Sequence, residues 1–93
     1  MNNVKIIKIR KKLDNLDDNL LNIIKKRSIL VSKILKQKRY KNQIIDKKRI
    51  KTILKNIKKK SIRKKVDPII TYKIWNSMIN AFIDYEYRNF KNK

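Results

Sequence analysis

One arginine lies in an apolar stripe of the N-terminal segment, where burying an uncharged residue would cost less free energy. At alternating spacings of three and four residues, the stripe reads Ile6, Ile9, Leu13, Leu16, Leu20, Ile23, Arg27, Leu30 and Ile34. This spacing is typical of a helix face that packs against another element. A charge on such a face is costly unless a partner neutralises it. An anionic ligand would do so; alternatively, the Arg27 side chain reaches past its neighbours to water.

Two further cations can be placed relative to Arg27 by helix geometry. Lys38 lies 11 residues beyond it, a rotation of about 20°, so on a continuous helix both side chains project from one face. Their Cα atoms would be roughly 16 Å apart, which lets two long side chains hold a small dianion. Arg10 lies 17 residues before Arg27, about 100° away around the axis. Arg10 is therefore better placed to serve the pocket of a partner chain in an antiparallel helix pair.

Three polar residues mark the inner faces of the later segments. Arg49 follows Asp46 by three residues, so an Asp46 that caps a helix can also orient the Arg49 guanidinium. Glu86 continues the apolar stripe of Trp75, Ile79 and Phe82. Each of these positions alone is typical of a surface or capping residue, but polar residues on the inner faces of all three segments together indicate a site for an anion.

The composition excludes several kinds of chemistry. The 93 residues contain no Cys, no His and no Gly. Disulfides, zinc sites and catalysis by Cys or His are therefore excluded, as is a glycine-rich phosphate loop. No cofactor is expected.

The charge and hydropathy pattern bears on location and partners. No apolar run is long enough to span a membrane, and the N-terminus does not look like a secretion signal, so we expect a cytoplasmic protein. The net charge of +21 suggests nucleic acid as a partner. However, the basic residues are spread over all segments, and abundant Lys, Ile and Asn are typical of an AT-rich genome. We therefore expect no specific nucleic-acid binding, although a basic helical nucleic-acid-binding protein remains an alternative.

Three helices account for nearly the whole chain, and no strand pattern appears. We expect the first helix over residues 4–39, a connector over 40–45, a second helix capped by Asp46 and ending in the turn at 59–65, and a third from Asp67-Pro68 to about Phe90. The first helix would be roughly 54 Å long, whereas a compact domain of this size is only about 30 Å across. The sequence therefore predicts one all-α domain over residues 1–93 that pairs its long helices in a homodimer.

The order and spacing of these residues resemble the all-helical (type II) chorismate mutases. The resemblance is carried by Ile9-Arg10-Lys11-Lys12-Leu13-Asp14-Asn15-Leu16-Asp17, Leu20-Leu21, Arg27, Val31, Lys36-Gln37-Lys38 and Asp46-Lys47-Lys48-Arg49. It covers almost the whole chain and implies three helices per chain, an intertwined homodimer and conversion of chorismate to prephenate on the route to Phe and Tyr.

The resemblance also implies a role for each candidate residue. Arg10 would reach the partner's site, Arg27 and Arg49 would bind the carboxylates of the chorismate dianion, Lys38 would bind its ether oxygen, and Asp46 would contact the ring hydroxyl. The rearrangement is concerted and needs no nucleophile, metal or cofactor, so cations that orient the dianion and stabilise charge on the ether oxygen suffice. Glu86 can help at that oxygen only when it is protonated.

Two positions depart from the usual pattern of these mutases. Ile50 stands where they usually have Glu, and an apolar residue there is similar to the related isochorismate-pyruvate lyases and to some small basic mutases. Phe82 replaces a Ser one turn before Glu86, which itself stands where many members have Gln. Elimination of pyruvate from isochorismate on the same scaffold is therefore the first alternative activity.

Overall fold

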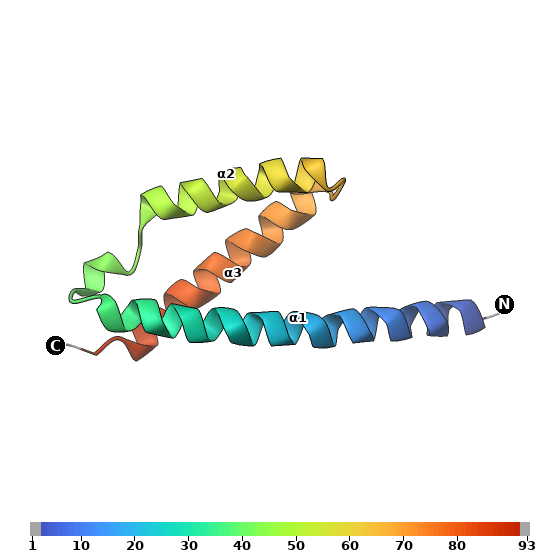
Figure 1. Cartoon of the computed structure of the whole chain (residues 1–93), viewed down its shortest axis with the longest axis horizontal. Coiled ribbons are helices and arrows are strands. Elements are labelled where there is room, and N and C mark those ends of the chain that lie inside the picture. Colours follow the sequence, from blue (N-terminus) through green and yellow to red (C-terminus); the bar gives the residue numbers. More distant parts are fainter. Residues whose placement is uncertain (1–2, 92–93) are drawn as a thin grey trace. The chain divides into compact units, whose positions relative to one another are not determined.

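The chain is all-helical, as the sequence predicts. The computed structural model describes residues 3–91, and its elements follow the chain as α1 (Val4–Gln37), a short 3₁₀ turn η1 (Lys41–Gln43), α2 (Lys47–Arg63) and α3 (Pro68–Asn89) (Figure 1). The described residues contain no strand. None of their helices is both long enough and apolar enough to cross a bilayer.

The chain divides into two compact units, the first ending at Val31 and the second beginning at Ser32. The first unit is a single run of helix, and its apolar stripe is open in the isolated chain. Leu13, Leu16 and Leu20 are 52%, 61% and 52% exposed. A helix this apolar along one face is stable in water only when another surface covers that face.

The predicted end of the first helix was two residues too late, because α1 ends at Gln37. The Lys38 amide still donates to the Leu35 carbonyl in a tighter turn (3.1 Å). The next two amides, of Arg39 and Tyr40, instead donate to the side-chain oxygen of Gln43. Because these amides leave the helical pattern of hydrogen bonds, Lys38 lies just outside α1 and does not continue the same helix as Arg27, contrary to the prediction.

The start of α2 is set by a cap. The Asp46 carboxylate accepts a hydrogen bond from the Arg49 backbone amide (Oδ1–N 3.0 Å), which satisfies an amide that has no partner within the helix. The predicted cap is confirmed; the role of Asp46 toward the Arg49 guanidinium stays a prediction.

The end of α2 uses a left-handed residue. The Val66 amide donates to the Ser61 carbonyl (2.9 Å) and the Lys65 amide to the Ile62 carbonyl (3.2 Å), which is the Schellman pattern. This pattern needs a positive φ at Lys65, which has φ 57°. Glycine usually occupies that position, and the chain has none.

The third helix begins where Asp67-Pro68 predicts. The Asp67 carboxylate accepts from the Ile69 amide (2.8 Å), and Pro68 is the first helical residue. The chain reverses at this turn, so α2 and α3 run in opposite directions and lie closest where they meet (Figure 1). There the buried hydroxyls of Ser61 and Thr71 share a hydrogen bond of 2.8 Å, which ties the two helices together.

Candidate active site

Lys38 and Glu86, the lysine after α1 and the acid of α3, form an ion pair in the second unit. The Lys38 ammonium donates to the Glu86 carboxylate (Nζ–Oε1 2.9 Å), and the two side chains are 18% and 9% exposed. The pair joins residues 48 positions apart in the sequence. Since charges this far from water are costly unless they are paired or hydrogen-bonded, the pair marks a place where the fold holds charge at some cost to stability.

The position of Glu86 follows from its place on α3. It comes four residues after Phe82 on the inner side of the helix, and only 6% of the residue is exposed. This agrees with the burial expected from the apolar stripe. Phe82 is half-buried one turn earlier, so the surroundings of Glu86 on its own helix are partly apolar.

The position of Lys38 is fixed by the loop that follows it. Its ammonium also donates to the Ile44 main-chain carbonyl, at a longer distance of 3.4 Å. Leu35 and Ile44, the two buried apolar residues of the described chain, lie on either side of Lys38 in the sequence. The lysine is therefore held between two residues that anchor the loop.

A second contact ties α3 to the last turns of α1. The hydroxyls of Ser32 and Tyr85 lie 2.7 Å apart and are partly buried. Tyr85 immediately precedes Glu86, so this hydrogen bond helps to fix the part of α3 that carries the acid. Sequence spacing does not predict this pair, because Ser32 and Tyr85 lie 53 positions apart.

Three of the candidate site residues, Asp46, Arg49 and Ile50, lie at the cap and in the first turn of α2. Asp46 and Arg49 are exposed, whereas Ile50, in the first turn of α2, is half-buried. The roles of these residues toward a ligand remain predictions.

The two arginines of α1 belong to the first unit. Arg10 is exposed and Arg27 is half-buried. The neighbours of Arg27 in the apolar stripe, Ile23 and Leu30, are more exposed, at 53% and 58%. That these arginines join one site with Lys38 and Glu86 is a prediction.

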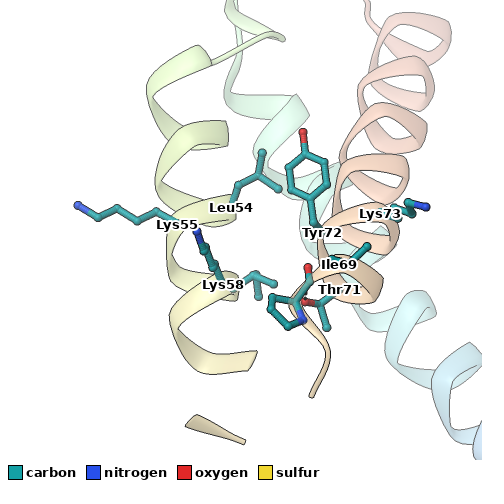
Figure 2. A pocket seen from close by; sticks show the side chains of 9 residues that line it. Leu54, Lys55, Lys58, Ile69, Thr71, Tyr72 and Lys73 are labelled. Carbon is teal, nitrogen blue, oxygen red and sulfur yellow. Dashed lines mark hydrogen bonds between the residues drawn. The ribbon is translucent and has the colours of Figure 1, made fainter. Parts of the chain in front are cut away.

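A groove lies elsewhere, between α2 and α3. Its volume is about 610 Å³, and its lining includes Leu54, Ile57, Ile69 and Tyr72. Leu54 and Tyr72 face each other across it, whereas the lysine side chains at 55 and 73 extend away on opposite sides (Figure 2). A lining this apolar suits a covering apolar surface better than a small dianion.

The chemistry available at the Lys38–Glu86 pair is electrostatic. Within residues 3–91 no three acids or other metal-binding side chains cluster closely enough to hold an ion. Lys38 supplies three donors and a positive charge, and Glu86 supplies an acceptor, or a donor when it is protonated. Such a pair can bind an oxygen that gains negative charge during a reaction.

Comparison with known protein families identifies the chain's relatives. A family described as chorismate mutase type II matches residues 9–87, which span α1 from its second turn, all of α2 and most of α3. No curated protein and no solved structure matches the chain.

Proposed function

The chain belongs to the family of type II chorismate mutases, and on that premise we propose that it rearranges chorismate to prephenate in the biosynthesis of Phe and Tyr. The reaction is an intramolecular shift, in which one C–O bond breaks while a C–C bond forms. It needs no cofactor. The protein must hold a flexible dianion in its reactive shape and stabilise the charge that grows on the ether oxygen.

The single observation that best supports this proposal is the Lys38–Glu86 pair (2.9 Å). A lysine held by an acid and a carbonyl is kept in place before the substrate arrives, which is how preorganised electrostatic catalysis works. In this proposal the ether oxygen takes a hydrogen bond from Lys38, and Glu86, once protonated, donates a second one.

The remaining roles come from the family. Arg27 and Arg49 bind the substrate carboxylates, for which the fork of a guanidinium is well suited. Asp46 contacts the ring hydroxyl, and Ile50 and Phe82 line the site.

A homodimer is part of the proposal, with the Arg10 of each chain completing the site of the other. The exposed apolar stripe of α1 supports it, because residues such as Leu16 (61% exposed) need a covering surface. We place this enzyme in the cytoplasm, with chorismate as its small-molecule partner and with no specific nucleic acid and no membrane as partners.

Loss of pyruvate from isochorismate is the second candidate activity. It is favoured by Ile50, which is half-buried near the start of α2 and offers no polar group to a substrate hydroxyl. To separate the two activities, purified protein is incubated with chorismate and isochorismate separately, and the products are identified by chromatography. We expect prephenate from chorismate; pyruvate from isochorismate as the main product would instead establish the lyase.

Shared sites are tested by mixing two inactive variants, Arg10→Ala and Arg27→Ala. In a heterodimer one site receives both substitutions and the other receives neither. Activity should therefore reappear after subunit exchange, at about one wild-type-like site per heterodimer. No recovery, with exchange verified by mass spectrometry, would contradict a shared site.

A further inference from the structure

The loop after α1 is organised by one carboxamide. Gln43 Oε1 accepts hydrogen bonds from two consecutive main-chain amides, those of Arg39 (2.7 Å) and Tyr40 (2.9 Å). Both amides have left the helical pattern, so without Gln43 they would need water as their partner. The side chain thus fixes the path of the main chain directly after Lys38.

The main chain at Gln43 also forms the turn before Ile44, whose carbonyl accepts the second hydrogen bond of Lys38. The Gln43 amide donates to the Tyr40 carbonyl (3.0 Å), and the Ile44 amide donates to the Lys41 carbonyl (3.1 Å). These two bonds form the turn that presents the Ile44 carbonyl to the Lys38 ammonium (3.4 Å). The Gln43 side chain therefore holds the start of the loop at Arg39 and Tyr40, and main-chain hydrogen bonds carry the turn from there to Ile44.

We propose that Gln43 is a positioning residue for Lys38, in that its two hydrogen bonds hold the loop that aims the Lys38 ammonium at the reacting oxygen. This inference rests on the proposed function, because it assigns Lys38 to the ether oxygen. Gln43 itself acts through the loop and touches no substrate. Its side chain is exposed, so its removal leaves no buried cavity and should not unfold the chain.

The expected effect is on turnover more than on binding. Binding of the dianion is shared by several cations, whereas stabilisation of the ether oxygen depends on where one ammonium lies. A displacement of about 1 Å of a reacting group can cost on the order of a hundredfold in rate. Gln43→Ala should loosen the loop without unfolding it, so the loss of rate should be smaller. We therefore expect this variant to lower kcat about tenfold with little change in KM.

Two companion variants test whether the hydrogen bonds carry the effect. Gln43→Glu keeps an oxygen that can accept from both amides, and it should recover most of kcat. Asn42→Ala removes a carboxamide from the same turn, η1, and should leave kcat unchanged. A tenfold loss in all three variants, or in none, would overturn the positioning role.

Two spectroscopic readouts do not depend on turnover. Hydrogen exchange of the Arg39 and Tyr40 amides should become faster in Gln43→Ala and stay slow in Asn42→Ala. The ammonium resonance of Lys38, assigned with Lys38→Arg, should be shifted or broadened in Gln43→Ala alone.

These readouts separate a failure of this inference from a failure of the proposed function. If the wild type turns over neither chorismate nor isochorismate while the Lys38 resonance responds as expected, Gln43 does position Lys38 and the proposed enzymatic activity is wrong. If chorismate is turned over but the Lys38 resonance and kcat are unchanged in Gln43→Ala, the positioning role is wrong.

Discussion

Replacing Glu86 should separate its structural role from its catalytic role. Glu86→Gln keeps the shape of the side chain and an oxygen that accepts from Lys38, but it removes the counter-charge. Glu86→Leu removes both the charge and the acceptor, so the Lys38 ammonium would retain only the longer bond to the Ile44 carbonyl (3.4 Å).

The size of the stability effect follows from burial. Removing one member of a fully buried ion pair costs about 3–5 kcal/mol, and the pair here is slightly wetter, with side chains 18% and 9% exposed. We therefore expect Glu86→Leu to lower the free energy of unfolding by about 3 kcal/mol and Glu86→Gln by about 1–2 kcal/mol, because a hydrogen bond to a charged group remains.

Urea denaturation measures both values at a fixed protein concentration, because the stability of the proposed dimer would depend on that concentration. With a slope of about 1.5 kcal/mol per molar urea, the midpoint should fall by about 2 M for Glu86→Leu and by about 1 M for Glu86→Gln. Equal midpoints for the two variants would show that the acceptor oxygen contributes nothing.

Activity should respond differently from stability. In the proposed mechanism Glu86 donates a hydrogen bond to the ether oxygen, and the amide of Glu86→Gln supplies a permanent donor of the same shape. Glu86→Gln should therefore keep most of the wild-type kcat/KM, whereas Glu86→Leu, which has no donor, should lower it. If Glu86→Gln is inactive while the wild type is active, Glu86 acts as a base or a structural anion, and the donor role is wrong.

Three further predictions concern the surface and the helix contacts. Binding to nucleic acid should be independent of sequence and should weaken steeply between about 50 and 200 mM salt; nanomolar, sequence-selective binding at the higher salt would contradict this. Thr71→Val removes a hydroxyl that is hydrogen-bonded to Ser61 at 2.8 Å and should lower the free energy of unfolding by about 1 kcal/mol, whereas Thr52→Val, at an exposed site, should change it less in the same urea titration. Lys65→Gly relieves a positive φ of 57° and should raise the thermal midpoint by an amount equivalent to about 1 kcal/mol; an unchanged or lower midpoint would mean that Lys65 makes compensating contacts.

The helix starts could be predicted from the sequence because each is signalled locally. Asp46 and Asp67 are side chains that cap the helix directly following them, and Pro68 fits only a first turn. Local signals of this kind require no knowledge of the rest of the fold.

The end of α1 could not be predicted in the same way. Nothing in the helical periodicity breaks at Gln37, and the apolar and basic pattern continues past it. The helix stops because Gln43, which follows in the sequence, takes the next two amides. A side chain beyond the helix that accepts these amide hydrogen bonds does not change the spacing of apolar residues within the helix.

The candidate site was predicted in part. Glu86 was identified because an acid interrupts an apolar stripe, and Lys38 was identified from its spacing and from the family resemblance. Their direct pairing joins residues 48 positions apart, and sequence spacing gives no information about such a contact. The Ser32–Tyr85 hydrogen bond is of the same kind, because both residues are ordinary on their own helix faces.

Chorismate mutase activity is tested most directly by following chorismate by proton NMR in the presence of the purified wild-type protein and, in parallel, of Lys38→Ala at the same concentration. We expect wild-type protein to convert chorismate to prephenate in equal amounts with no pyruvate released, and Lys38→Ala to be slower by about 10²–10³-fold, the usual cost of losing one preorganised donor. Disappearance of chorismate at the uncatalysed rate with the wild type would contradict the mutase activity, and equal rates for the two proteins would contradict the role of Lys38.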